Sequence, residues 1–371
     1  LPKRWNCQLK QEVYHPTCLF LSKLLSGLLH PLWLLFSHTK YFSALDKSKI
    51  KKIIIGEYHC IGDVVLIIPA LKVLKKSFPD AELTLITNPD IRELAEEMNI
   101  AHEIISFQAP WARGKRKWKL WKNARSLAIY LQQKSYDLGI DFKGDLRNLY
   151  FLWKIKPSFR AGFTASGGKF LLTHPFDFPF QLHQSNRALS LLNKLGISYS
   201  GPTKPLSLPK PKDSRCNQIV IHPGANHPER KWPVTNWVKL IQSLRQTHKI
   251  VLVCTKDLIQ DTEKILLGCP GLETFKGTLL EFSCWLQNQK LLVGPDSMAV
   301  HLAVALNVPA LSIFGAQNPN LTRPCEPHGH IVQPKLPCTH KRKNWRLCSR
   351  CLASIKPKEV HKKIIEIIPK R

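Results

Sequence analysis

Acidic residues are scarce in this chain of 371 residues, which has 26 Asp and Glu against 55 Lys and Arg and a net charge of +29. A field of this sign concentrates phosphates, nucleic acid and anionic membrane surfaces near a protein, so the composition predicts a polyanionic partner. Nucleic acid is the rival polyanion, but no recognised nucleic-acid-binding motif supports it, so it is not expected as that partner. Phosphorylated ligands and anionic lipids remain.

The 11 cysteines lack the dense, even spacing of a small secreted scaffold, which excludes a fold built on disulfides and favours a reducing compartment. Disorder is excluded as well, because hydrophobic residues make up 44% of the chain. The length predicts about two domains, since a domain usually takes roughly 100 to 200 residues.

The N-terminal region contains one long apolar run, residues 19–36 (LFLSKLLSGLLHPLWLLF), without the short core and small-residue cleavage site of a signal peptide. Ser22, Ser26 and His30 are four residues apart, which predicts a helix with a narrow polar stripe and a wide apolar face. Lys23 and His30 disfavour a membrane-spanning helix and favour one that lies in the membrane interface with its polar stripe in water. A helix packed on the protein's own surface is the alternative.

From residue 51 onward, short apolar runs alternate with amphipathic stretches, which predicts an α/β fold with parallel sheets. In the first half the predicted strands are residues 51–56, 82–87, 102–107 and 136–142, and the predicted helices are 61–78, 90–99, 115–134 and 187–195. In the second half the predicted strands are residues 218–222, 249–254, 273–275, 290–293 and 310–314, and the predicted helices are 234–246, 258–267, 279–287, 298–306 and 358–368.

A proline-rich stretch separates the two halves. Residues 201–213 (GPTKPLSLPKPKD) contain four prolines and no apolar periodicity, which predicts a stiff, extended linker. The predicted order is a membrane-associating segment 1–50, a first lobe 51–200, the linker 201–215 and a second lobe 216–371. Two wound halves of this kind place a ligand cleft at the carboxyl ends of their sheets.

The first chemical signal is the strand-to-helix turn at residues 56–69 (GEYHCIGDVVLIIP), where Gly62 and Asp63 open a helix. Asp63 is either an ordinary helix N-cap or a carboxylate at the mouth of the cleft that takes a proton from an acceptor hydroxyl.

The second signal is residues 219–233 (IVIHPGANHPERKWP), where a strand enters a turn formed by Gly224, Ala225 and Asn226. Small residues let backbone N–H groups approach an anion, and Lys231 supplies positive charge, so the turn suits a phosphate. An ordinary turn with solvated basic residues is the alternative.

The third signal is residues 291–301 (LLVGPDSMAVH), where a buried strand breaks and a helix begins at Asp296 and Ser297. The unpaired N–H groups of such a helix start can bind a diphosphate, and a simple Asp-Ser cap is the alternative.

Together with YDLGIDFKGDLRN at residues 136–148 and IFGAQNP at 313–319, these stretches resemble, in order and spacing, the bacterial lipopolysaccharide heptosyltransferases of glycosyltransferase family 9. The resemblance runs from about residue 51 to the C-terminus. It implies a GT-B fold, with two Rossmann-like doubly wound lobes facing each other across a cleft, the acceptor on the first and the nucleotide sugar on the second. It further implies inverting transfer of heptose from ADP-heptose to a phosphorylated lipopolysaccharide inner core at the cytoplasmic face of the inner membrane, without a metal or other cofactor.

The same resemblance assigns roles to residues. Asp63 matches the catalytic aspartate and Lys231 the lysine that meets the donor phosphate. In the implied mechanism, Asp63 deprotonates an acceptor hydroxyl that attacks the anomeric carbon, while Lys231 and a helix N-terminus stabilise the leaving diphosphate. The other positions matched to donor binding are Gly224, Ala225, Asn226, Asp296, Ser297, Met298, Ala299 and His301.

Three departures from the family pattern have consequences. Met298 stands where glycine is expected, which predicts a narrower phosphate site or a different donor preference. The usual acid for the nucleotide ribose is missing from residues 254–264 (CTKDLIQDTEK), so Gln260 or Asp261 is expected to take that role. Lys143 stands where a neutral Gln is common, and together with Gly62 it is assigned to the acceptor side.

Residues 113–125 (RGKRKWKLWKNAR) place seven Lys and Arg in thirteen positions, interleaved with Trp118 and Trp121. On a helix this is a cationic face that suits the phosphates of lipid A or anionic lipid headgroups, and Lys115, Arg116 and Lys117 are therefore assigned to acceptor binding. A solvated surface is the alternative.

Near the C-terminus, Cys338, His340, Cys348 and Cys351 follow the spacing C-x-H-x7-C-x2-C. Four such groups can hold a structural zinc, but the spacing is not that of a standard finger, so free or paired thiols without a metal are expected.

Two other functions stay open. The same fold can use another nucleotide sugar, such as a UDP-sugar. Met298 and the missing ribose acid also fit a degenerate pair of lobes that binds an anionic glycolipid without turnover.

Overall fold

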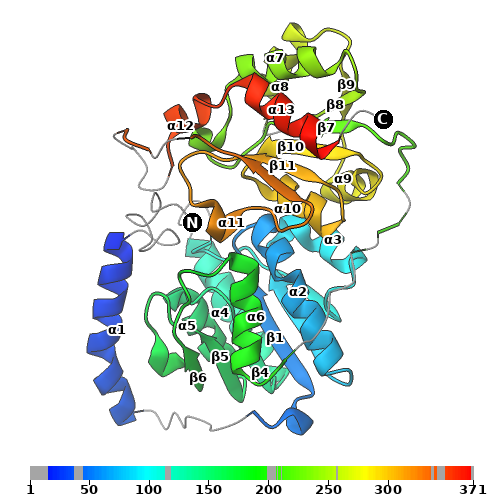
Figure 1. The fold of residues 1–371 in the computed structure, drawn as a ribbon. Coiled ribbons are helices and arrows are strands. Elements are labelled where there is room, and N and C mark those ends of the chain that lie inside the picture. Colours follow the sequence, from blue (N-terminus) through cyan, green and yellow to red (C-terminus); the bar gives the residue numbers. More distant parts are fainter. Residues whose placement is uncertain are drawn as a thin grey trace. The chain divides into compact units, whose positions relative to one another are not determined.

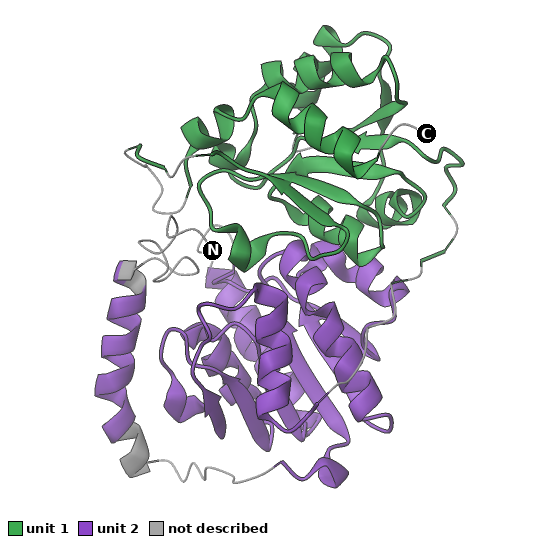
Figure 2. Cartoon of the chain, in the orientation of Figure 1, with its two compact units in different colours: residues 1–12, 204–371 green, residues 13–203 purple. Residues whose placement is uncertain are grey.

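The computed structural model describes residues 16–36, 45–112, 118–198, 206, 208–209, 211–255, 258–335, 338–340 and 347–368. The chain divides between residues 203 and 204 into two compact units, and Figure 2 shows each in its own colour. The described parts of these units are residues 16–198 and 206–368.

Residues 16–198 are built on a six-stranded parallel sheet with the order β3-β2-β1-β4-β5-β6. Its strands are β1 (Lys52–Glu57), β2 (Glu82–Thr87), β3 (Glu103–Ser106), β4 (Leu138–Asp141), β5 (Phe159–Phe163) and β6 (His174–Phe176). The helices are α1 (Pro16–Phe36), α2 (Ile61–Ser77), α3 (Arg92–Glu97), α4 (Trp118–Gln133), α5 (Leu146–Ile155) and α6 (Gln184–Lys194), with short 3-10 turns η2 (Lys47–Lys49), η3 (Pro89–Ile91) and η4 (Lys169–Leu171) (Figure 1). β1 is central and almost wholly buried, as its KIIIGE sequence requires.

Residues 206–368 form a second six-stranded parallel sheet with the order β12-β11-β10-β7-β8-β9. Its strands are β7 (Ile219–Ile221), β8 (Ile250–Val253), β9 (Glu273–Phe275), β10 (Leu291–Pro295), β11 (Ala310–Ile313) and β12 (Gly329–Val332). The helices are α7 (Val234–Leu244), α8 (Ile259–Gly268), α9 (Leu279–Leu286), α10 (Met298–Ala305), α11 (Pro319–Thr322), α12 (Ser349–Ala353) and α13 (Pro357–Ile367), with the 3-10 turn η5 (Pro228–Arg230).

The two sheets share one topology. Counted within each unit, both have the strand order 3-2-1-4-5-6 of a doubly wound fold, so the prediction of two Rossmann-like lobes is confirmed. In each sheet the order reverses at one point, between β1 and β4 in the first unit and between β7 and β10 in the second. Ligands of open α/β sheets bind outside the carboxyl ends of the strands at such a switch point.

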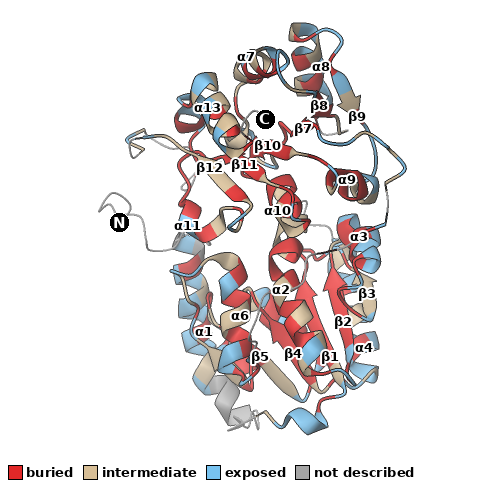
Figure 3. Cartoon of the chain, turned by 45° about the vertical axis from the view of Figure 1, so that its right-hand side comes forward, coloured by how far each residue is buried: buried red, intermediate tan, exposed pale blue. Residues whose placement is uncertain are grey.

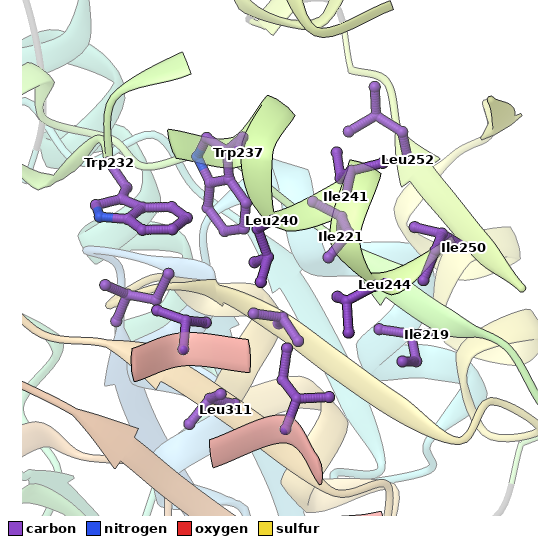
Figure 4. Packing of buried hydrophobic residues seen from close by; sticks show 14 of the residues in the cluster. Ile219, Ile221, Trp232, Trp237, Leu240, Ile241, Leu244, Ile250, Leu252 and Leu311 are labelled. Carbon is purple, nitrogen blue, oxygen red and sulfur yellow. The ribbon is translucent and has the colours of Figure 1, made fainter. Parts of the chain in front are cut away.

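A hydrophobic core fixes the turn that leads from β7 into α7. Trp232 and Trp237 pack edge to face with their ring centroids 4.9 Å apart, and both are almost fully buried. Figure 4 shows the two rings beside the aliphatic side chains of β7, α7 and β8. The Trp232 indole also donates a hydrogen bond of 3.2 Å to the carbonyl of Ile355. The residues just before Trp232, including Lys231, are therefore joined directly to a firmly anchored segment.

The N-terminal helix α1 docks through its polar stripe. Ser26 is buried, and its Oγ accepts a hydrogen bond of 2.7 Å from the N–H of Gly168. The His30 ring lies 6.0 Å from that of Phe170. The prediction that this stripe lies in water is wrong at Ser26, because the small serine lets the helix approach the 167–168 turn closely. The alternative of a helix packed on its own protein fits this contact.

The apolar face of α1 points away from the protein. Figure 3 shows the exposed positions along the helix, and the large apolar side chains among them are Phe20, Leu21, Leu24, Leu25, Leu28 and Leu29. Among the described residues, no helix combines the length and the apolar character needed to cross a bilayer.

The structure describes the predicted basic helix from Trp118 onward. α4 begins at Trp118, and Lys115, Arg116 and Lys117 lie outside the described residues. The next basic side chains along it, Lys119, Lys122 and Arg125, are exposed.

Candidate active site

In the first unit the charged groups gather after β1 and β4, the two strands that flank the switch point. Asp63 lies in the first turn of α2, directly after β1, and Lys143 lies in the turn after β4. Lys143 Nζ is 2.9 Å from Asp63 Oδ1, although 80 residues separate them in sequence. The Gln184 side chain, from α6, donates a hydrogen bond to the same Oδ1. Side chains from the turn after β4 and from the start of α6 therefore converge on one carboxylate of α2.

Glu57 and His59 extend this cluster. Glu57, the last residue of β1, is fully buried, and its Oε1 is 3.8 Å from Lys143 Nζ and 3.5 Å from His59 Nδ1. Burial alone lowers the pKa of His59, but the hydrogen bond and charge of Glu57 outweigh it, so the pKa of His59 is raised. Two carboxylates and two basic groups thus share one small site.

The charge of Lys143 controls the titration of Asp63. Burial by itself raises the pKa of Asp63, but the charge and hydrogen bond of Lys143, aided by His59 and Gln184, hold that pKa well below its usual range. Burial lowers the pKa of Lys143, yet the charges of Asp63 and Glu57 outweigh this effect and raise it. Both members of the pair are therefore ionised at neutral pH. With its side chain 18% exposed, Asp63 remains reachable.

A rigid turn holds Lys143 in place. Asp141, the last residue of β4, accepts hydrogen bonds from the N–H groups of Lys143 and Gly144 and from the Asn148 side chain. Burial raises the pKa of Asp141 to about 7 despite these bonds. Gly144 has φ +69°, and a Cβ added at this position would lie 2.7 Å from the backbone nitrogen of Ala165. The turn therefore requires glycine for both its dihedral angle and its packing.

We expect Gly144→Ala to lower the free energy of unfolding by at least about 3 kcal/mol, because backbone atoms block the new methyl group. Gly196→Ala is a matched control, since Gly196 has φ +71° but no atom within 4 Å of an added Cβ. Its expected loss is about 1 to 2 kcal/mol from the dihedral angle alone. Urea unfolding of both variants measures the difference, and equal losses would contradict the crowding at Gly144.

In the second unit the matching site follows β7 and β10. The turn after β7 contains Gly224, buried, Ala225, half-buried, and Asn226, exposed, and leads through η5 to Lys231. Lys231 Nζ is 2.6 Å from Asp261 Oδ2, in the first turn of α8. Gln260 is exposed beside it and makes no such pair. Of the two candidates for the ribose contact, only Asp261 therefore reaches the lysine.

The end of β10 is joined to the same turn. Arg230 Nη1 lies 3.4 Å from Asp296 Oδ2 and 3.4 Å from the Asp296 carbonyl oxygen. The Gln317 side chain donates a hydrogen bond of 2.8 Å to Asp296 Oδ2, and His301 Nε2 lies 3.9 Å from Oδ1. Asp296 thus connects β10, α10 and the turn after β11 to residues 224–231, the segment after β7 that carries Arg230 and Lys231 and is called the cationic turn below.

The start of α10 offers hydrogen-bond donors. Ser297 is its N-cap but makes no side-chain cap, and its buried Oγ has no hydrogen-bond partner. The first N–H groups of a helix, here at Met298 and Ala299, have no intrahelical partners. Together they form a neutral donor set that suits an anion, with the half-buried Met298 side chain at its edge.

A small pocket of about 170 Å³ opens beside the cationic turn, lined by Pro223, Lys231, Trp232, Pro233, Val234, Trp237 and Asp261. It has room for part of a ligand, such as a phosphate with one neighbouring group, and the paired Lys231 and Asp261 are the charged residues on its wall.

Sequence reasoning located both turns but missed several partners. Asp63 and Lys143 form an ion pair in the first site, and Gly62 precedes Asp63 in the first turn of α2. In the second unit Lys231 pairs with Asp261 and His301 contacts Asp296, whereas Gln260 is exposed. The missed groups are Glu57, His59, Gln184, Arg230 and Gln317. A buried glutamate inside the apolar strand KIIIGE was the one local signal, because an acid is rarely fully buried without a partner.

The comparisons with known proteins agree with this geometry. A family model described as glycosyltransferase family 9 (heptosyltransferase) matches residues 124–349, more than half of the chain. Lipopolysaccharide heptosyltransferase 3 of Escherichia coli is 27% identical over 293 residues, which covers 72% of this chain and 83% of that protein. Lipopolysaccharide core heptosyltransferase OpsX of Haemophilus influenzae is 20% identical over 301 residues, covering 76% and 84%.

Solved structures share the fold. The E. coli ADP-heptose lps heptosyltransferase II superposes with a TM-score of 0.66 at 18% identity, covering 86% of this chain and 98% of that one. E. coli heptosyltransferase WaaC with ADP-2-deoxy-2-fluoro heptose gives 0.68 at 18% identity, covering 85% and 99%. These likenesses confirm the GT-B fold, and with the family match they establish that the chain is a glycosyltransferase that belongs to glycosyltransferase family 9.

Proposed function

We propose that this glycosyltransferase moves heptose from ADP-heptose to the phosphorylated inner core of lipopolysaccharide. The observation that carries the proposal is the pair of switch-point sites: an ionised Asp63 held by Lys143 in one unit, and the Lys231 turn beside the start of α10 in the other. The sugar and the acceptor class come from the names of the relatives, which are heptosyltransferases of lipopolysaccharide.

In the proposed reaction, Asp63 takes a proton from an acceptor hydroxyl as the hydroxyl oxygen attacks the anomeric carbon. The bond from that carbon to the donor diphosphate breaks, and negative charge grows on the departing oxygen. Lys231, Ser297 Oγ and the N–H groups at the start of α10 are placed in one unit to stabilise such a charge. In this proposal the lysine and the hydrogen-bond donors of the protein stabilise the leaving group, and the transfer needs no metal.

Lys143 has two tasks in this scheme. It keeps Asp63 ionised in the free enzyme, and it presents a positive charge to an anionic acceptor. When an acceptor phosphate or carboxylate binds Lys143, its hold on Asp63 weakens, so the carboxylate becomes a stronger base. Acceptor binding and base activation are then coupled through one lysine.

The acceptor is a lipid, and two surfaces fit association with the cytoplasmic face of the inner membrane. α1 exposes six large apolar side chains while Ser26, on its polar stripe, is buried against the protein. α4 exposes Trp118 and Trp121 with neighbouring Lys119 and Lys122. Apolar side chains insert at the acyl boundary, and basic side chains bind anionic headgroups.

Calorimetry with ADP-heptose, UDP-glucose and GDP-mannose tests the donor. We expect selective binding of ADP-heptose, weakened roughly 10- to 100-fold in Lys231→Ala, because a charge-assisted contact contributes about 1.5 to 3 kcal/mol. Lys239→Ala is the matched control, since Lys239 is an exposed lysine of α7.

Because Asp261 loses its partner in Lys231→Ala, the double variant Lys231→Ala, Asp261→Asn separates the lost cation from the unmasked acid. Preference for UDP- or GDP-sugar would keep the enzyme class and overturn the heptose donor. Absence of binding to every donor would favour the degenerate glycolipid-binding alternative.

A further inference from the structure

The four thiol and imidazole groups near the C-terminus come together in the second unit. Cys338, His340, Cys348 and Cys351 each direct one potential ligand atom into a common space, and these four atoms all lie within 4.8 Å of one another. Cys348 is the N-cap of α12 and Cys351 lies within that helix, so one helical turn presents both sulfurs to the same side. Cys338 and His340 come from the segment that follows β12.

The imidazole is at the centre of the contacts. His340 Nδ1 is 3.5 Å from the Cys348 sulfur, 3.5 Å from the Cys351 sulfur and 3.9 Å from the Cys338 sulfur. In a tetrahedral zinc site with Zn–S of about 2.3 Å and Zn–N of about 2.0 Å, each sulfur is about 3.5 Å from the nitrogen. The observed separations match this edge length without any movement of the chain at two of the three sulfurs.

Paired thiols explain the arrangement less well. Three cysteines cannot all pair with one another, and a disulfide gives no reason for a histidine nitrogen to face every sulfur. Cys338, Cys348 and Cys351 form no disulfide, so no such bond accounts for their approach to the imidazole.

We propose that Cys338, His340, Cys348 and Cys351 bind one zinc ion in a closed, tetrahedral structural site. This site is separate from the proposed sugar transfer and needs no metal in the reaction. The geometry revises the sequence-based expectation of thiols without a metal. Four protein ligands leave no open position for a substrate or water, as in structural zinc sites.

The neighbours of the cluster indicate what the metal stabilises. Ala316 packs against Cys348 and Cys351, and the next residue, Gln317, donates the hydrogen bond to Asp296. On the other side, α12 continues to Leu352 and Ile355, and the Ile355 carbonyl accepts the hydrogen bond of Trp232, the residue after Lys231. The zinc would thus fasten a loop that supports both parts of the donor site.

The test uses the full chain, purified without chelators and under reducing conditions. Elemental analysis by mass spectrometry is expected to find about one zinc per chain, absent from Cys351→Ser and His340→Ala. Cys216→Ser is the control, because Cys216 is an exposed cysteine of the same unit and should keep the metal. Replacement by Co²⁺ is expected to give the visible absorption of a tetrahedral site and a thiolate-to-cobalt charge-transfer band.

A second measurement covers the case in which the variants do not fold. Removal of zinc from the wild-type chain with a chelator is expected to lower Tm by at least about 5 °C, and added Zn²⁺ alone should restore it. The proposal is overturned if the wild-type chain binds no zinc by either route or if Cys351→Ser binds as much as wild type.

Discussion

Asp63→Asn is expected to lower kcat for sugar transfer by about 100- to 10,000-fold, the range that a general base contributes, while donor affinity stays unchanged. Asparagine has nearly the same shape and its oxygen still accepts hydrogen bonds from Gln184 and Lys143, but it cannot take the proton. Initial rates at saturating ADP-heptose and acceptor measure the loss, and calorimetry with ADP-heptose measures the affinity.

Two controls make this result specific. Asp90→Asn removes an exposed acid from the start of η3 in the same unit and should leave kcat unchanged. Thermal unfolding of Asp63→Asn excludes misfolding as the cause. Full transfer by the folded variant would remove Asp63 from the role of base, whereas equal losses of transfer and donor binding would move it to the donor site.

Much of the fold was predictable because its central strands are buried on both faces. Continuous apolar runs such as β1 and β10 differ clearly from the amphipathic helices between them. The elements that escaped prediction include the edge strands β6 (HPF) and β12 (GHIV), which are short and mostly half-buried. Such strands form because a neighbouring strand offers its free backbone groups, which local sequence does not reveal.

The sequence indicates positions for the candidate site but not their pairings. Asp63 and Lys231 stand out as candidates because strand ends and helix starts have local signals. The partners Lys143 and Asp261 lie 80 and 30 residues away and meet them only because strand order brings their loops to one sheet edge. The stripe on α1 shows the same limit, since spacing identifies a polar face but not whether water or protein covers it.

Lys143→Gln is expected to move the acid limb of the pH profile of kcat/KM to higher pH. In the wild-type chain Lys143 holds the pKa of Asp63 well below its usual range, so the carboxylate stays ionised and kcat/KM should not fall between pH 9 and pH 5. Without that cation, only His59 and Gln184 still oppose the effect of burial, so the pKa of Asp63 rises. Protonation of the base then begins within the measured range, and kcat/KM of the variant falls as pH approaches 5.

Lys76→Gln is the matched control, because it removes one exposed positive charge from the far end of the helix that carries Asp63. Its profile should equal that of the wild-type chain. Since kcat/KM reports the free enzyme, displacement of Lys143 by a bound acceptor does not affect the comparison. An unchanged acid limb in folded Lys143→Gln would mean that Asp63 is not the titrating base. A shifted acid limb together with a raised acceptor KM would instead support both roles of Lys143. The same charge would then keep Asp63 ionised and bind the acceptor.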